Sequence, residues 1–338
     1  MTDTAWETLS NQAVAAAGVV YFLALLVHLA EWASLRQPKA ARSAAAAGAQ
    51  EQGAGGTAVA VATGPEGADG ADGRAGRVAF LGRLGVMLTA IACAAHGVAL
   101  LGRGLAADPN RVPWGNMYEF TLSGTFVVTL MYLVLYKRLG LHWMAPLVVG
   151  FVTATLMIAV IWLYAEVSPL TEALNSPWLV IHVVSAVIAT GAFTIGGILS
   201  IMYLVKDRRG EWTTGPLARV PSLQALDRAA YRVHAFAFPV WTFAVLITGP
   251  IWAHEAWSRY WNWDPKEVWA FITWVVYAAY LHARATGGWK GRNAALLAVV
   301  GLATLWFNFI GINYFSTTSQ HSYAAPVAAD APVLGARE

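Results

Sequence analysis

The chain has 338 residues, of which 57% are hydrophobic and only 12% are charged, whereas an ordinary soluble domain carries roughly 25% charged residues. This composition excludes a soluble enzyme and indicates an integral membrane protein. The net charge of +3 gives no reason to expect a nucleic-acid partner, because membrane topology accounts for the basic residues. The single cysteine, Cys93, excludes an internal disulfide.

Eight membrane spans are predicted, since an apolar run of roughly 20 residues marks a spanning helix. The fold class is therefore an all-α polytopic membrane protein. In chain order the predicted spans are Ala13–Leu35, Val78–Leu101, Glu119–Tyr136, Trp143–Leu163, Trp178–Val205, Tyr231–Trp252, Val268–Ala283 and Ala294–Phe315.

The spans divide the chain into four parts. Residues 1–35 hold the N-terminal spanning helix, and residues 36–77, rich in Ala and Gly, are predicted to be a disordered cytoplasmic linker because they cannot bury a core. Residues 78–323 form the membrane domain, and residues 324–338 form a C-terminal tail.

Lys and Arg are concentrated in alternate loops, which predicts the orientation of the chain. Both termini and the loop between the sixth and seventh spans are expected to face away from the cytoplasm, across a cell (plasma) membrane. The basic residues assigned to the cytoplasmic side are Arg36, Lys39, Arg42, Arg74, Arg77, Lys137, Arg138, Lys206, Arg208, Arg209, Arg219, Arg228, Arg284, Lys290 and Arg292.

The loop before the seventh span is unusually rich in tryptophan. Trp257–Trp274 contains five of the chain's 16 tryptophans. Within it Asp264 is predicted to be first of all a helix N-cap, Pro265 the first helical residue and Glu267 the partner of Asp264 in a capping box.

Two interpretations of these tryptophans are about equally favoured by composition. Tryptophans collect at the membrane–water interface, and this explanation is sufficient for Trp252 and Trp274. The W-N-W sequence beside a charged D-P-K-E turn also matches what a large flat ligand would need, namely aromatic surface around a few polar groups.

Three histidines stand out by their predicted depth. His182 lies about one turn into the fifth span from its outer end, and His321 follows the eighth span on the same side. His282 lies about 25 Å below Pro265 at 1.5 Å per residue, in the inner leaflet. Two neutral imidazoles beside an aromatic cradle suit bis-histidine ligation of haem iron, although His321 alone could equally be a solvated tail residue. For the isolated His28 and His96 we favour a hydrogen bond between helices.

The motifs resemble those of a known family. The segment W-N-W-D-P-K-E-V-W-A-F-I-T-W closely resembles the WWD domain of haem-handling proteins, and W-G-N-M-Y-E-F at Trp114–Phe120 matches the segment ahead of the next span in the CcsA/ResC (CcsB) family of System II cytochrome c assembly proteins. The similarity runs from about Val78 to Tyr323.

The resemblance implies a function and a set of sites. His182 and His321 occupy the places of the two external axial ligands, and His282 the place of the inner histidine that receives haem b on entry. The external cradle would comprise Trp257, Trp261, Trp263, Asp264 and Trp269.

The family's activity is haem export followed by covalent attachment of haem to the reduced C-x-x-C-H thiols of an apocytochrome c, a haem lyase activity. Its members act with a ResB/Ccs1-type membrane protein and with thiol-reducing proteins. The chemistry belongs mainly to haem and thiols, and the protein positions them.

Two other functions were weighed. A transmembrane b-type electron carrier would place histidine pairs on two helices, and no predicted span contains two well-separated histidines. A haem chaperone of the CcmC type binds haem without attaching it, but is shorter. Maturation of a reporter cytochrome c separates the chaperone from the synthase.

Overall fold

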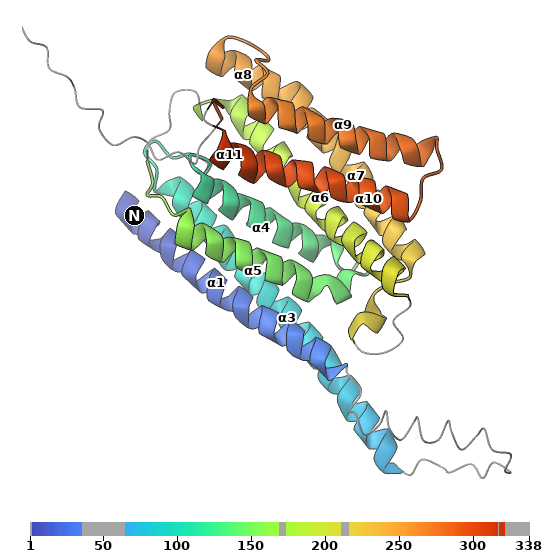
Figure 1. Cartoon of the computed structure of the whole chain (residues 1–338). Coiled ribbons are helices and arrows are strands. Elements are labelled where there is room, and N and C mark those ends of the chain that lie inside the picture. The colour runs from blue at the N-terminus through green and yellow to red at the C-terminus, as the bar shows by residue number, and fades with distance from the viewer. Residues whose placement is uncertain (1, 36–64, 169–173, 211–215, 317, 322–338) are drawn as a thin grey trace, which may run out of the picture.

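The computed structural model describes residues 2–35, 65–168, 174–210, 216–316 and 318–321, and within these ranges the protein is all-α, as predicted. The elements in chain order (Figure 1) are α1 (Asp3–Ser34), α3 (Pro65–Leu105), α4 (Met117–Leu135), η1 (Leu141–Met144), α5 (Ala145–Trp162), α6 (Pro177–Arg209), η3 (Pro216–Arg219), α7 (Leu223–Thr242), η4 (Phe243–Thr248), α8 (Gly249–Trp257), α9 (Pro265–Ala285), α10 (Arg292–Trp306), η5 (Phe307–Gly311) and α11 (Ile312–Phe315).

The long helices lie side by side in one bundle (Figure 1). Helix α6 is central, since it contacts α4, α7 and α10, while α1 packs on α3 and α5 and α9 packs on α10. The start of α1, helix α8 and helix α11 lie toward one end of the bundle, and the connection from α9 to α10 lies at the other. We call the first of these the tryptophan-loop end, because residues 258–264, the tryptophan loop, connect α8 to α9 there.

Several of these helices begin at a polar N-cap residue, which lies just before the apolar residues of the helix. Asn116 accepts a hydrogen bond from the Glu119 amide at 2.9 Å to begin α4, and Ser176 accepts one from the Trp178 amide at 3.1 Å to begin α6. Each cap satisfies an amide that has no partner within its helix. The helix starts at the tryptophan-loop end are therefore fixed by local sequence.

Seven helical segments within the described residues are long and apolar enough to cross a membrane, where the sequence analysis predicts eight spans. The remaining predicted span, Val268–Ala283, lies within helix α9. With 21 residues α9 measures about 31 Å at 1.5 Å per residue, so its length suffices. Its apolar residues include Trp and Tyr, whose polar ring atoms give it a lower hydropathy than its neighbours.

The structure corrects one predicted boundary, the end of the linker. Helix α3 begins at Pro65, so the last part of the predicted linker, residues 65–77, is helical; an apolar run marks only the part of a helix that meets hydrocarbon, and a helix can extend beyond it. Residues 36–64 of the linker and the predicted tail at 324–338 lie outside the described residues.

The predicted sixth span is not one regular helix, because the π-helical segment η4 separates α7 from α8.

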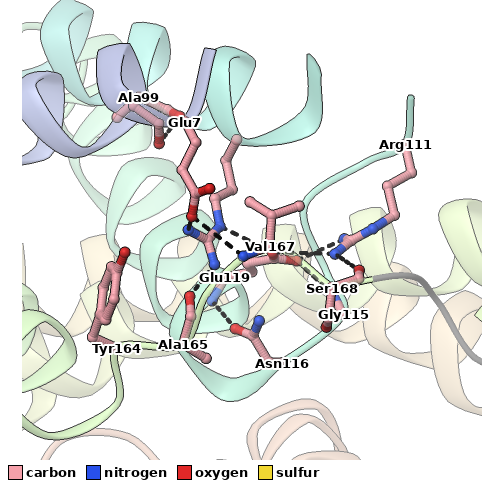
Figure 2. A network of polar contacts seen from close by, with 12 residues as sticks. Glu7, Ala99, Arg111, Gly115, Asn116, Glu119, Tyr164, Ala165, Val167 and Ser168 are labelled. Atoms are coloured by element: carbon pink, nitrogen blue, oxygen red, sulfur yellow. Dashed lines mark hydrogen bonds and ion pairs between the residues drawn. The ribbon is translucent and has the colours of Figure 1, made fainter. Parts of the chain in front are cut away.

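A buried ionic network ties the loops together at the tryptophan-loop end (Figure 2). The fully buried carboxylate of Glu119 accepts hydrogen bonds from Arg103 Nε at 3.1 Å, Arg111 Nη1 at 2.7 Å and the Gly115 amide at 2.7 Å. Arg103 also lies 3.5 Å from Glu7 on α1. One carboxylate of the W-G-N-M-Y-E-F segment thus joins α3, α4 and the loop between them, and Arg103 extends the network to α1.

We expect Glu119→Gln to destabilise the bundle by about 3–5 kcal/mol, because it leaves two guanidinium groups facing a neutral amide in a buried site. Thermal unfolding of the purified protein in detergent measures this loss. The matched control is Glu166→Gln, since Glu166 is exposed in the neighbouring loop. Equal melting temperatures for the two variants would contradict the assignment.

Candidate functional site

A cavity of about 200 Å³ opens at the tryptophan-loop end and continues into the bundle between α4, α6, α9 and α10. Most of its wall is apolar. The polar and aromatic residues at the end nearest the loop include His182, Trp252, Tyr260, Trp261, Lys266, Glu267 and His321. The cavity therefore brings together the two histidines that the sequence analysis placed in one external site.

His182 is held by a main-chain carbonyl that a π-helix makes available. Its Nδ1 lies 2.9 Å from the carbonyl oxygen of Ala244 in η4. Because a carbonyl only accepts, Nδ1 must carry the proton, and the lone pair of a neutral ring is then on Nε2. Gly249 permits the approach, since a Cβ there would lie 3.2 Å from the His182 ring. This is the arrangement of a metal-ligating histidine whose other nitrogen is oriented by a neighbour.

His321 is oriented by a carboxylate. Its Nδ1 lies 3.2 Å from Oδ1 of Asp264, an ion-pair contact without the alignment of a full hydrogen bond. The main chain of His321 is fixed on both sides, because its amide donates to Ser319 Oγ at 3.2 Å and its carbonyl accepts from Lys266 Nζ at 3.4 Å. His321 is therefore packed into the site and is not a solvated tail residue.

Asp264 has two tasks, of which the sequence predicts the first. It caps α9 by accepting from the Lys266 amide at 2.8 Å, and the predicted capping box with Glu267 is present. The same carboxylate accepts from Ser319 Oγ and from the Gln320 amide, both at 2.7 Å. Burial alone would raise the pKa of Asp264, but the neighbouring His321 ring and the Ser319 hydroxyl outweigh it and hold the pKa well below its usual range.

Trp252 is the aromatic centre of the site. It is 2% exposed, so its assignment to an interfacial belt is wrong. Its ring stacks on His182 at 5.9 Å between centroids and meets the edge of His321 at 5.4 Å. Trp257 packs against both Trp252 and His321, at 4.8 Å from each. A regular apolar run concealed this role, because Trp252 is the last residue of a predicted span.

The other loop tryptophans have different environments. Trp261 lines the cavity, and its buried indole Nε1 has no hydrogen-bond partner within the described residues. Trp263 is 70% exposed and has a positive φ of 56°, so the structure does not bring it into the cavity. Trp269 packs on Phe307 at 4.2 Å between ring centroids and does not line the cavity. The aromatic residues at the cavity therefore include Trp252 and Trp261, with Trp257 behind them.

Three further histidines that the sequence analysis considered, His28, His96 and His282, do not line this cavity. His282 is exposed near the end of α9, toward the opposite end of the bundle. His28 and His96 are buried between helices, His28 lying 3.4 Å from Thr89 Oγ1, consistent with a contact between helices. His96 packs between Tyr21 and Phe126.

Two polar residues of the cavity were missed by the sequence analysis. Asn308 lies in the second π-helical segment, η5, is 7% exposed and has a buried Oδ1 without a hydrogen-bond partner in the described chain. Lys266 lies two residues after Asp264, in the charged D-P-K-E turn, and the sequence analysis gave it no role in the site. Neither has a sequence signal of its own, since π-helices are not marked by periodicity and a lysine beside a span is ordinary.

This donor set could hold a metal that brings most of its own ligands with it. The described residues contain no group of three or more His, Cys, Asp or Glu side chains that could hold a metal ion. Two imidazoles with oriented rings are instead what a metal needs when its equatorial ligands arrive with it, as in a porphyrin. The tryptophan rings supply apolar surface for a flat macrocycle.

Comparison with known proteins gives a matching family model and several similar proteins. The family model described as "Cytochrome C assembly protein" matches residues 114–319. The chain is 32% identical over 277 residues to "Cytochrome c biogenesis protein CcsA" of Synechococcus sp. (strain JA-3-3Ab), covering 64% of this chain and 78% of the relative.

Proteins with the same description in two algae are also similar. The Chlamydomonas reinhardtii protein is 36% identical over 222 residues, covering 62% of this chain and 60% of its own length. The Porphyra purpurea protein is 31% identical over 283 residues, covering 72% and 88%. Each match extends over most of this chain.

Asp264→Asn separates the two tasks of the carboxylate. Asn caps a helix as well as Asp, so α9 should begin normally. Its Nδ2 donor would face the Gln320 amide or the Ser319 hydroxyl, and the charge beside His321 would be lost. We expect faster hydrogen exchange of the residue 319–321 amides, measured by mass spectrometry.

The matched control is Ser222→Asn, which exchanges the cap of α7 for another good cap and should leave exchange at residues 319–321 unchanged. Protection of the Gln320 amide equal to that of the unmodified protein in Asp264→Asn would show that the carboxylate does not hold this segment.

Proposed function

The chain belongs to the family of cytochrome c assembly proteins, of the CcsA type, and on this premise we propose that its cavity holds haem for covalent attachment to an apocytochrome c. The observation that carries the proposal is the pair His182 and His321. Each has its Nδ1 beside an oxygen acceptor, and both line one cavity with Trp252 and Trp261. Haem b is the substrate as well as the bound ligand.

The orientation in the membrane follows from charge. At the end opposite the tryptophan loop the described chain carries Lys137, Arg138, Arg208, Arg209, Arg219, Arg284, Lys290 and Arg292. At the tryptophan-loop end, Arg103 and Arg111 are engaged by Glu119. Because basic residues favour the cytoplasmic side, the cavity faces outward, where apocytochromes receive haem.

His282 supports the proposal of an entry site. It is exposed on α9 near the basic end, so a second membrane protein of the ResB/Ccs1 type can approach it and contribute the other axial ligand. Haem would pass from this site to the external cavity. The two sites lie at opposite ends of α9, about 24 Å apart along the helix between residues 266 and 282 at 1.5 Å per residue.

The attachment reaction requires positioning and no further reagent. Each apocytochrome thiol adds across one vinyl C=C of haem, so that a C–S bond forms and the thiol hydrogen goes to the other vinyl carbon. A thiol-reducing system keeps both cysteines reduced beforehand. This chain's residues hold the iron and the ring plane, which makes it a subunit of a haem lyase.

The first test replaces the two proposed ligands. His182→Ala and His321→Ala should each abolish maturation of a reporter cytochrome c when expressed with the partner, because one axial position is empty. Added imidazole should restore part of the activity by filling that position. His142→Ala, at the opposite end of the bundle, is the control and should mature the reporter normally.

Full maturation activity in both single variants would contradict the proposal that His182 and His321 bind the haem iron together. Haem binding by the unmodified complex without maturation of any reporter would identify a haem chaperone in place of a lyase.

The second test uses two tryptophans of the same loop. Trp261→Ala should lower the haem content of the purified complex several-fold. Trp261 lines the cavity, and a contact between aromatic rings contributes about 1 kcal/mol of binding free energy beyond the burial of apolar surface. Trp263→Ala should keep the normal haem content, because Trp263 is exposed. Equal losses in both variants would show that the loop is an interfacial anchor.

A further inference from the structure

A second cavity lies along the outer face of the bundle. It has a volume of about 670 Å³ and is lined by residues of α4, α6 and α7, with α3 and the α3–α4 connection at one end. We call it the lateral groove. Its lining residues Leu130, Val134, Val184 and Phe236 are 43%, 55%, 41% and 53% exposed. The groove therefore opens sideways, toward the lipid that surrounds a membrane bundle.

The lateral groove has the length and the chemistry that suit a lipid acyl chain. Along α4 its lining runs from Ser123 to Leu135, which is about 18 Å at 1.5 Å per residue. One hydrocarbon leaflet is about 15 Å deep, half the core of a bilayer. Ser123, the one hydroxyl in the described lining, accepts a hydrogen bond from Trp114 Nε1 at 3.0 Å. The wall therefore offers apolar surface along most of its length.

One charge interrupts this apolar wall, at the end opposite the tryptophan loop. Arg232 is the only charged residue among the described residues that line the groove, and it is exposed. Within the described residues it has no hydrogen bond or ion pair, and Asp227, the acidic residue of α7, is bound by Arg284. Arg232 also lies inside a segment long and apolar enough to span a membrane. A guanidinium in that position is costly unless it reaches an anion or the headgroup layer.

Two further cations flank the same end of the lateral groove. Arg228 lies one turn before Arg232 on the same face of α7, and Arg138 adjoins the groove residue Leu139; both arginines are exposed. Guanidinium groups bind phosphate through paired hydrogen bonds. Basic sites between helices on the cytoplasmic side of a membrane bind anionic lipid headgroups. The groove therefore ends in a group of charges that suits a lipid phosphate.

We propose that the lateral groove binds one anionic phospholipid of the inner leaflet, with an acyl chain between α4 and α7 and the phosphate at Arg232. A phospholipid supplies an apolar chain of leaflet length together with an anion at one end of it. A helix of another protein would need an acidic residue of its own opposite Arg232. Val187 lines both the groove and the cavity at the tryptophan-loop end, so the bound lipid packs against the back of that cavity's wall. The proposal does not depend on which ligand that cavity holds.

The test titrates the full chain, purified in detergent and freed of lipid, with phosphatidylglycerol or phosphatidylcholine of identical acyl chains. Native mass spectrometry gives the dissociation constant of the first bound lipid. The unmodified protein should prefer phosphatidylglycerol. Arg232→Gln should weaken phosphatidylglycerol binding about fivefold, which corresponds to about 1 kcal/mol, the contribution of one basic residue near an anionic lipid surface. It should weaken phosphatidylcholine binding less, because the choline cation already offsets the phosphate charge.

A second variant tests the groove itself. Ile188 lines the lateral groove and does not line the cavity at the tryptophan-loop end, so Ile188→Trp should fill the groove and weaken the binding of both lipids. The matched controls are Arg292→Gln, an exposed arginine at the same end of the bundle, and Ile201→Trp, an exposed residue of α6 outside the groove. Both controls should bind phosphatidylglycerol as the unmodified protein does. Thermal unfolding shows whether each variant is folded.

Unchanged phosphatidylglycerol binding in Arg232→Gln overturns the proposal, as does unchanged binding in a folded Ile188→Trp variant. Equal losses in Arg232→Gln and Arg292→Gln also overturn it, because the lipid would then respond only to the overall charge of that end. If the unmodified protein binds neither lipid and Ile188→Trp releases a co-purifying membrane protein, the groove is a protein interface and not a lipid site.

Discussion

The carboxylate of Asp264 is the group on which the cavity depends, because it joins two segments 55 residues apart in the sequence. It begins α9 and also holds Ser319, Gln320 and the His321 ring. At 5% exposure such a carboxylate would be costly to leave unpaired. Docking of residues 319–321 therefore compensates the burial of Asp264, and the position of His321 and the start of α9 form one unit.

A second constraint comes from two interruptions of regular helix. In η4 the Gly249 amide donates to the Ala244 carbonyl five residues earlier, and the same carbonyl meets His182 Nδ1. In η5 the Ile312 amide likewise donates to the Phe307 carbonyl, five residues earlier. Asn308 lies within that segment and lines the cavity. Isolated π-helical turns occur often at functional sites, and here both border one cavity.

The sequence predicts the features that local chemistry determines. The capping box joins Asp264 and Glu267, which are three residues apart, so the sequence motif predicts it directly. The lengths of the apolar runs predict the helices. The role of Trp252 could not be read, because stacking on His182 depends on how α6 and α8 pack. Likewise Trp261 and Trp263 cannot be distinguished by spacing, because a loop has no periodicity and the exposure of Trp263 depends on how the loop folds.

The low pKa of Asp264 also determines when the site is assembled. A carboxyl group whose pKa is lower in the folded state contributes stability that is complete above its unfolded pKa, about 3.9, and is lost as the pH falls through the folded value. The docking of residues 319–321 on Asp264 therefore persists in mildly acidic solution. Because Asp264 stays ionised there, its contacts with Ser319, Gln320 and the His321 ring are kept. The acceptor that orients His182 is the main-chain carbonyl of Ala244, which does not titrate, so the two rings are held by acceptors of different kinds, one of them independent of pH.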